Sequence, residues 1–291
     1  MRMLKQLKTK KGRDESELFI IEGEKFVQEI PAHWRVTQYV AAERYAKAHD
    51  LSQYERRARC DVVRDSIFDS LADTVSPQGI MAVCEQRKFT IGDCWPNPVI
   101  ASEAKQSGKT ALCPKTSGLL RENHPRNDEG CLHCTGSIFI LLGENLNDPG
   151  NIGALIRTAA AAGANGVILT AGSVDIYNPK VLRAAAGAVL RLPIVTDADL
   201  AETIARLKEK NIPTYAAHPR GSVTPYELDL RADFCLLVGN ESHGISDTAA
   251  ELADTLVSLP MVNNTESLNA SVAGSILMYE AVRQRIAFLR K

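Results

Sequence analysis

The sequence predicts a two-domain α/β protein whose C-terminal domain is built on a mostly parallel sheet. From residue 137 onward, short apolar strands alternate with helical segments, the pattern of a sheet covered by helices on both faces. The run 138–142 is continuously apolar, as a strand buried on both faces requires. Residues 14–88 show a shorter alternation of the same kind. We therefore divide the 291-residue chain into an N-terminal domain at 1–88, a linker or insertion at 89–136 and a second domain at 137–291.

The N-terminal domain is predicted from apolar runs separated by helical segments. The strands are expected at 18–21, 39–40, 60–63 and 80–84, and the helices at 24–30, 41–49 and 66–71. Ser66 is the expected N-cap of the third helix. The first thirteen residues carry six cations, Arg2, Lys5, Lys8, Lys10, Lys11 and Arg13. This run is either a solvated, mobile terminus or a local contact for nucleic acid.

Residues 89–136 differ from the rest because four prolines and many polar residues break any periodicity. A segment this long without a pattern of its own is typical of a flexible insertion. Cys131, His133 and Cys134 have the spacing of half a zinc site, but Cys94 and Cys113 do not supply a second pair. The sequence therefore favours a flexible insertion and no metal.

The C-terminal domain is predicted from five apolar runs and four helical segments. The strands are expected at 138–142, 167–169, 214–217, 234–238 and 256–259, and the helices at 153–162, 180–190, 199–210 and from Ser267 onward. Ser267 is the expected N-cap of the last helix. Gly274 inside that helix costs about 1 kcal/mol relative to Ala, which indicates a packing or binding reason. Pattern alone predicts an unknotted, doubly wound sheet.

Composition excludes several classes of protein. No apolar run approaches the ~20 residues that span a bilayer, and lysines occupy the place of a signal-peptide core, so we expect a cytoplasmic protein without a membrane. In that compartment the seven cysteines are expected to be thiols or metal ligands. A net charge of −1 gives no global argument for nucleic acid, so any such binding must be local.

Three polar stretches follow apolar strands and are candidates for a site. Residues 147–159 read NDPGNIGALIRTA, and residues 237–246 read LVGNESHGIS. Residues 259–273 read LPMVNNTESLNASVA. Asn151 is placed to cap a helix or to present its amide, and Arg157 is either a site residue or a surface ion pair. Gly239 permits close approach of a ligand to the backbone, although none of these loops is a phosphate-binding or dinucleotide fingerprint.

Together, in this order and spacing, the three stretches resemble the motifs of the SpoU (TrmH-like) family of RNA ribose 2′-O-methyltransferases, within the SPOUT superfamily. The resemblance covers 137–291 closely, and residues 14–88 look like the family's N-terminal RNA substrate-binding domain. It implies a C-terminal α/β fold with a deep trefoil knot, S-adenosylmethionine as cofactor, no metal, and a homodimer with the active site at its interface. Ribosomal RNA is the more expected substrate, ahead of transfer RNA.

The resemblance also implies site residues, matched motif by motif. The expected catalytic residues are Asn151, Arg157, Glu241, Ser267 and Asn269. The expected cofactor-binding residues are Gly239, Leu259, Met261 and Leu268, with Asn263 and Asn264 as neighbours. Because a guanidinium stays protonated at physiological pH, Arg157 is expected to fix a phosphate and to stabilise charge on the 2′-oxygen, not to act as a base.

Three other functions remain open at this stage. One is a non-catalytic RNA-binding or ribosome-assembly protein on the same scaffold, against which the five intact catalytic positions argue. Another is a SPOUT enzyme that methylates a base. The third is a nucleotide-binding module of another class, which the missing phosphate-loop signature disfavours.

Overall fold

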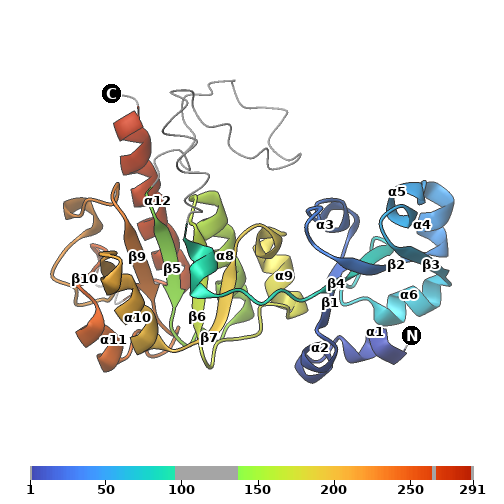
Figure 1. Ribbon diagram of the computed structural model, residues 1–291, viewed down its shortest axis with the longest axis horizontal. Coiled ribbons are helices and arrows are strands. Elements are labelled where there is room, and N and C mark those ends of the chain that lie inside the picture. The colour runs from blue at the N-terminus through green and yellow to red at the C-terminus, as the bar shows by residue number, and fades with distance from the viewer. Residues whose placement is uncertain (1, 96–136, 264–266, 290–291) are drawn as a thin grey trace.

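The computed structural model describes residues 2–95, 137–263 and 267–289, which form two α/β units side by side along the long axis (Figure 1). Most of the predicted insertion, with Cys113, Cys131 and Cys134, lies outside the described residues. Within the described part of the chain, no helix is long and apolar enough to cross a membrane.

The N-terminal unit is a four-stranded sheet in the order β1-β4-β2-β3. Its strands are β1 Leu18–Glu22, β2 Val36–Ala42, β3 Arg59–Val63 and β4 Ile80–Glu85. Its helices are α3 Glu24–Gln28, α4 Glu43–Ala48, α5 Ser52–Glu55 and α6 Asp65–Leu71. All four predicted strands are present. The predicted cap of α6 is wrong, because Arg64 holds the N-cap position and no side chain there makes a capping bond.

The first residues form two helices, α1 Arg2–Gln6 and α2 Lys10–Ser16, packed on the N-terminal unit. Leu4 and Leu7 are each 2% exposed. Arg13 is also buried, and its guanidinium donates to a carboxylate oxygen of Asp175 at 2.6 and 2.8 Å. The interpretation as a mobile terminus is therefore wrong, and Arg13 is not available to nucleic acid.

The C-terminal unit is a six-stranded sheet in the order β10-β8-β9-β5-β6-β7, with every neighbouring pair parallel. Its strands are β5 Phe139–Gly143, β6 Gly166–Thr170, β7 Ile194–Ala198, β8 Thr214–Ala217, β9 Phe234–Val238 and β10 Thr255–Val257. The parallel sheet was predicted, but β7 was missed. The predicted helix at 180–190 is broken in the structure, because Ala186 and Gly187 both have positive φ after α9 Pro179–Ala185.

Helices cover both faces of this sheet, as predicted (Figure 1). Alternate residues of each strand face opposite sides. Phe139 and Leu141 of β5 belong to the core that α8 Pro149–Ala161 and α12 Ala270–Leu289 close. Ile140 and Leu142 belong to the core on the other face, with α10 Leu200–Glu209 and α11 Asp247–Leu252.

The last helix, α12, packs closely against α8 and β9. A Cβ atom on Gly274 would lie 2.7 Å from Leu155 Cδ2 and 3.2 Å from Val238 Cγ2, so close packing explains this glycine. Arg285, in the last turns of α12, is buried, and its guanidinium donates to the carbonyl oxygens of Leu230 and Ala232.

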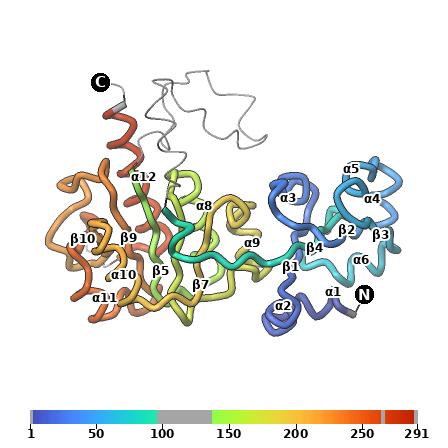
Figure 2. Tube along the Cα trace, in the orientation of Figure 1, coloured from blue at the N-terminus to red at the C-terminus, as the bar shows by residue number. Residues whose placement is uncertain are grey.

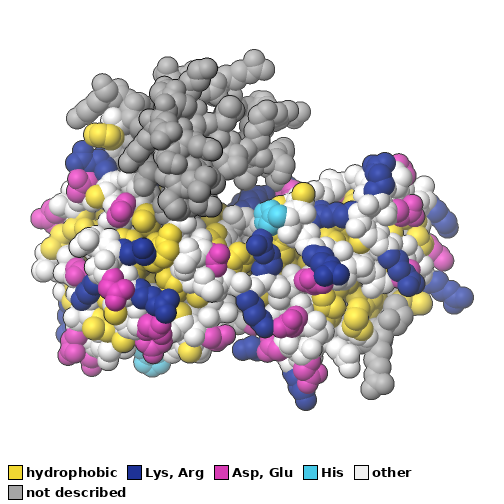
Figure 3. Space-filling view, in the orientation of Figure 1, with side chains coloured by type: hydrophobic (Ala, Val, Ile, Leu, Met, Phe, Trp, Pro, Cys, Tyr) yellow, Lys and Arg dark blue, Asp and Glu magenta, His cyan; other side chains and the backbone are white. Residues whose placement is uncertain are grey.

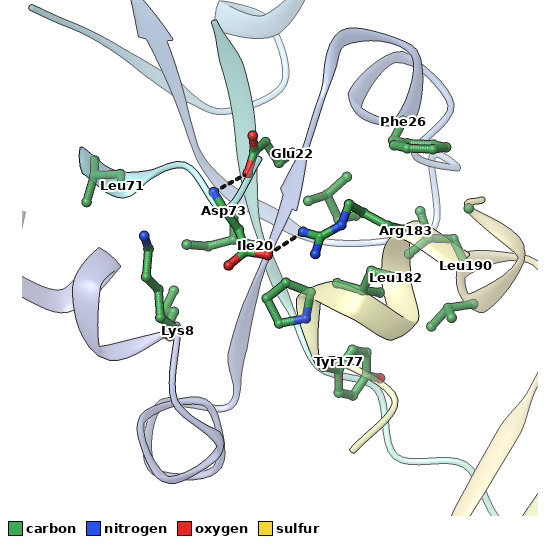
Figure 4. A pocket seen from close by; sticks show the side chains of 15 residues that line it. Lys8, Ile20, Glu22, Phe26, Leu71, Asp73, Tyr177, Leu182, Arg183 and Leu190 are labelled. Carbon is green, nitrogen blue, oxygen red and sulfur yellow. Dashed lines mark hydrogen bonds and ion pairs between the residues drawn. The ribbon is translucent and has the colours of Figure 1, made fainter. Parts of the chain in front are cut away.

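Hydrogen bonds and ion pairs join the two units. Trp34 Nε1 donates to the Leu190 carbonyl at 2.9 Å, and the Tyr177 hydroxyl bonds both backbone groups of Arg87 at 3.0 Å. Figure 4 shows a hollow between the units, with the ion pair of Asp73 and Arg183 at its rim. Its volume of about 50 Å³ is far below the roughly 300–1,000 Å³ of small-molecule sites, so we do not regard it as a ligand pocket.

The start of the insertion belongs to the C-terminal core. The 3₁₀ turn η1 Ile91–Cys94 is fixed by reciprocal bonds between Thr90 and Asp93. Cys94 is fully buried, and its Sγ lies 2.4 Å from the place where Gly166 would carry a Cβ. The boundary at residue 89 therefore cuts through packed structure.

Two deletions test this boundary. Replacing 97–135 by a flexible Gly-Ser linker should leave the thermal midpoint unchanged, because the buried contacts of Cys94 stay. Deleting 92–134 removes the buried contacts of Cys94 and should lower the thermal midpoint by about 2–4 °C for each kcal/mol of stability lost. Differential scanning calorimetry measures both. Unfolding of the C-terminal unit by the first replacement would mean that the insertion is structural.

Candidate functional site

The candidate site lies where the parallel strands β5 and β9 end side by side, although they are far apart in the sequence (Figure 2). From β5 the chain builds the sheet outward through β6 and β7, and the later strands lie on the other side of β5. In such sheets the crevice at the carboxyl ends, where the order reverses, is the usual place for a ligand. The backbone N–H of Glu144 donates to the Val238 carbonyl at 2.9 Å and holds the two strand ends together.

The loop after β9 is a tight turn that presents Glu241. Gly244 has φ of 70°, and its N–H donates to the Asn240 carbonyl at 2.9 Å. A Cβ on Gly239 would lie 2.3 Å from the Ile245 nitrogen, so the turn itself requires glycine here. The sequence-based reason for Gly239, close approach of a ligand, missed this intramolecular contact.

Glu241 is held by the start of α8. Its carboxylate accepts from the backbone N–H groups of Asn147 and Asp148, at 3.3 and 3.2 Å, and from the Asn151 side-chain amide at 3.2 Å. These three donors fix its orientation. Asp148, not Asn151, caps α8, since its side chain accepts from the Asn151 N–H at 2.8 Å. The side-chain amide of Asn151 is therefore available to the site.

Asn151 connects Glu241 to the start of α12. Its Oδ1 accepts from Asn269 Nδ2 at 3.0 Å and from Ser271 Oγ at 3.1 Å. The prediction that Ser267 caps this helix is wrong, because Asn269 Oδ1 accepts from the N–H groups of Ser271 and Val272. Ser271 was not predicted, although a serine in the first turn beside a capping asparagine is the signal that would have found it.

A cavity of about 370 Å³ lies beside this network, at the ends of β8, β9 and β10. The four residues expected to hold the cofactor, Gly239, Leu259, Met261 and Leu268, all line it, together with Ser267 and Glu241. Asn263 lies in the same connection, whereas Asn264 lies outside the described residues.

A loop at 218–221 closes the far side of the cavity. From the sequence, we did not predict that this loop belongs to the site. His218 N–H donates to the Val257 carbonyl, and Ser258 Oγ donates to the Gly221 carbonyl, both at 2.9 Å. A Cβ on Gly221 would lie 2.7 Å from the Leu256 oxygen, so only glycine permits this approach. Arg220 borders the cavity from this loop. A polar loop directly after the strand 214–217 is the signal that would have indicated it.

Arg157 is not brought together with the other catalytic candidates. It lies six residues after Asn151 on α8, about 9 Å further along the helix and roughly 240° around it. Its side chain is exposed, and within the described ranges it makes no hydrogen bond or ion pair. Thr158, the next residue, accepts a hydrogen bond from Ser275 of α12 at 3.1 Å, so Arg157 is adjacent in sequence to a contact between α8 and α12.

The chemistry of the cavity suits a small polar molecule with an apolar body. Val238, Leu259 and Leu268 supply apolar surface, and the ends of three strands supply backbone polar groups. The formal charges on its lining, as far as the chain is described, are those of Glu241 and Arg220, and Glu241 is already hydrogen-bonded by three donors. Glu241, Asn151 and Asn269 form a fixed polar edge against which a hydroxyl group can be oriented.

Comparison with known proteins gives a consistent result. Residues 138–279 match the SpoU rRNA Methylase family, and residues 1–82 match the MRM3-like substrate binding domain. The chain is 28% identical over 275 residues to 23S rRNA (guanosine(2553)-2′-O)-methyltransferase RlmP of Bacillus subtilis, covering 94% of this chain and 92% of that protein. It is 30% identical over 250 residues to 23S rRNA (guanosine-2′-O-)-methyltransferase RlmB of Bordetella pertussis, covering 85% and 88%.

Comparison with solved structures gives the same result as the comparison of sequences. The AdoMet-bound rRNA methyltransferase from Sinorhizobium meliloti superimposes with a TM-score of 0.71 at 26% identity, covering 97% of this chain and 93% of that one. A TrmH-family putative RNA methyltransferase from Porphyromonas gingivalis gives 0.72 at 26% identity, covering 97% and 96%. The fold, the length of the match and the relatives together establish that this chain belongs to the SpoU rRNA methylase family.

Proposed function

We propose that the protein is an S-adenosylmethionine-dependent methyltransferase that modifies a ribose 2′-hydroxyl of RNA, with ribosomal RNA as the more expected substrate. The observation that supports it most is the bonded group Glu241, Asn151 and Asn269 beside a cavity at three strand ends, in a chain of this family. The relatives named above are 23S rRNA 2′-O-methyltransferases.

The cavity fits the proposed cofactor. Its volume of about 370 Å³ lies within the roughly 300–1,000 Å³ of small-molecule sites. Gly239, Leu259, Met261 and Leu268 would hold the cofactor through backbone groups and apolar contacts. Bound there, S-adenosylmethionine would supply an electrophilic methyl group.

The catalytic roles follow from the geometry around Asn151. Glu241 holds the Asn151 amide, and Asn269 and Ser271 donate to its oxygen, so the polar edge is rigid before substrate arrives. Asn151 and Glu241 would orient the ribose, and Ser267 and Asn269 would complete its hydrogen bonds. Arg157 would bind the adjacent phosphate and stabilise charge on the 2′-oxygen. Methyl transfer needs in-line alignment, so positioning should supply most of the rate.

The separation of Arg157 from the network supports an active site shared between two copies of the chain. Val272, Ile276 and Tyr279 form an apolar stripe on α12 and are 46%, 40% and 53% exposed. Their spacing places them on one face of the helix. A homodimer through this stripe would cover it and bring Arg157 of the partner subunit to the Asn151 network.

The proposal includes the trefoil knot of the family. Val223 pairs with Val257 in a parallel bridge, and Ser258 N–H donates to the Val223 carbonyl at 2.9 Å. The connection after β10 therefore runs tightly against the loop after β8, as a threaded chain requires.

The proposed division of labour assigns RNA binding to residues 1–88, a connecting role to 89–136 and methyl transfer to 137–291. The match of residues 1–82 to a substrate binding domain supports the first assignment. The proposal includes action in the cytoplasm, in keeping with a ribosomal RNA substrate.

The test is incubation with radiolabelled S-adenosylmethionine and total RNA that lacks modifications, followed by digestion to nucleosides. A labelled 2′-O-methylnucleoside in ribosomal RNA is the expected product. Label on a base would assign the protein to base methylation. Cofactor binding without any label in RNA would support the non-catalytic alternative.

A further inference from the structure

A group of cationic side chains lies over the junction between the two units. Figure 3 shows Lys and Arg side chains and a histidine gathered on this part of the surface. Its centre is formed by the guanidinium groups of Arg57 and Arg87 beside the imidazole of His33, and we call these three residues the junction cluster. Each of the three has an exposed side chain. The methyl-transfer site described above uses none of them.

Arg87 is held rigidly although it is exposed. Its guanidinium carbon lies 4.8 Å from the ring centroid of Phe89 and 5.6 Å from that of Trp34. Its backbone is anchored across the junction by Tyr177, with both bonds at 3.0 Å. Two aromatic faces thus restrict the side chain and leave its N–H edge to solvent.

No carboxylate neutralises this guanidinium at ion-pair distance within the described ranges. Asp93 lies within electrostatic range, but its Oδ2 accepts from Thr90 N–H and Oγ1 at 2.7 and 2.8 Å. Those bonds are the main reason that the pKa of Asp93 is lowered, and Arg87 contributes less. The charge of Arg87 therefore remains available to a ligand.

Arg57 adds positive charge that is also not cancelled by a carboxylate. In the described part of the chain it forms no ion pair, and its guanidinium donates to the neutral carbonyl oxygens of Ile30, Pro31 and Trp34 at 2.8, 2.6 and 2.9 Å. These bonds fix the loop that carries His33. The pKa of His33 is lowered, first by partial burial and then by Arg87 and Arg57, which is an independent sign of positive potential at this place.

The lysines of the first helices do not form a comparable surface. Lys11 lies 3.7 Å from Glu15, and the ammonium of Lys8 donates to the carbonyl oxygens of Ser70 and Ala72. Lys10 shares a hollow with Asp14 and Glu17. Three of the six cations among the first thirteen residues, Lys10, Lys11 and Arg13, therefore lie beside carboxylates.

We propose that the junction cluster binds a phosphate group of the RNA backbone. A planar guanidinium with a free edge is the side chain best suited to phosphate oxygens, and such contacts set the register of RNA on a protein without reading its sequence. RNA held here would touch both units at once and would be aligned relative to the catalytic unit. This inference rests on the proposed function for the identity of the anion.

The test is Arg87→Gln, with Arg206→Gln as the control. Arg206 is an exposed arginine of α10 that pairs with Glu202. A transcript of 23S ribosomal RNA without modifications is the probe, and binding is measured by filter retention with S-adenosylhomocysteine present, between 50 and 300 mM salt. Arg87→Gln should weaken binding about tenfold at low salt and reduce the slope of log K against log salt by about 1. The control should change neither quantity.

A second variant keeps the test valid if Arg87→Gln perturbs packing on Trp34. His33→Glu adds a negative charge at an exposed position and should weaken RNA binding at least as much, with an unchanged thermal midpoint. Wild-type affinity and salt slope in both variants would overturn the proposal, as would an equal loss in the control.

Failure of this inference can be distinguished from failure of the proposed function. Methyl transfer by the wild-type protein with normal RNA binding by Arg87→Gln would leave the function standing and remove the phosphate site. Absence of methyl transfer by the wild-type protein, together with weakened RNA binding by Arg87→Gln, would remove the proposed function and leave the phosphate site standing. Tighter binding of the junction to an acidic polypeptide than to RNA would also overturn the assignment of the anion.

Discussion

Arg157→Ala should reduce methyl transfer by about 100-fold or more while leaving the affinity for S-adenosylmethionine nearly unchanged. We expect a loss of this size because removing one preorganised group that stabilises developing charge lowers the rate by about 10²–10³. Arg157 is exposed on α8 and does not line the cavity of about 370 Å³, so the cofactor has no direct contact to lose. Arg157→Lys should be intermediate, because an ammonium keeps the charge but not the planar pair of donors.

Isothermal titration calorimetry with S-adenosylmethionine and single-turnover transfer to RNA separate the two quantities. Arg206→Ala is the control, since it removes an exposed arginine from the opposite face of the sheet. Wild-type turnover in Arg157→Ala would remove Arg157 from the proposed active site. A large loss of cofactor affinity would mean that Arg157 supports the cavity, contrary to its position.

The secondary structure that was predicted correctly comes from long, strongly patterned segments. β5 and β9 are continuous apolar runs with turn residues at their ends, and the structure has both where they were expected. β7 was missed because its second half is exposed, with Thr196 and Asp197 at the surface and Asp197 at positive φ. Such a strand has neither an apolar run nor a regular alternation.

Helix ends were the least predictable feature, since several residues in each loop can cap. Ser267 and Ser66 were both expected as caps and neither is, while Asn269 caps α12. The choice depends on tertiary contacts, because Asn269 also donates to Asn151 of α8, which no local pattern reveals. The same reason explains why local sequence does not reveal the burial of Arg13 and Arg285, whose hydrogen-bond partners lie on distant segments.

The sequence predicted the part of the candidate site that lies directly after the apolar strands. Gly239, Leu259, Met261 and Leu268 were expected together and do line one cavity. Their role in binding remains a prediction. Arg220 and Ser271 were not expected, because their positions depend on Gly221 meeting the segment after β10 and on the packing of α12 against α8.

Ile276→Arg should convert the protein to a monomer and abolish methyl transfer while leaving the fold intact. Ile276 is already 40% exposed in the single chain, so arginine there meets solvent, whereas in a dimer it would be an unpaired charge at an apolar interface. Such a charge costs several kcal/mol, and two-fold symmetry would place one on each subunit, against the apolar burial that would hold the dimer.

Sedimentation velocity and the thermal midpoint are the measurements for this variant. Ala201→Arg adds the same charge to an exposed position of α10 on the other face of the sheet and should leave the protein dimeric and active. A dimeric, active Ile276→Arg protein would place the interface elsewhere.

Mixing two inactive variants tests whether the site is shared between subunits. Arg157→Ala removes the arginine, and Glu241→Gln replaces one acceptor oxygen with an amide that cannot accept from the N–H groups of Asn147 and Asp148. If Arg157 of the partner subunit completes each site, a reassorted mixed dimer has one intact site and one doubly altered site. Half of the dimers are then mixed, so about a quarter of wild-type activity should return. If Arg157 serves its own subunit, every site in the mixture lacks one group and no activity returns, so the recovery of activity distinguishes a shared site from two separate ones.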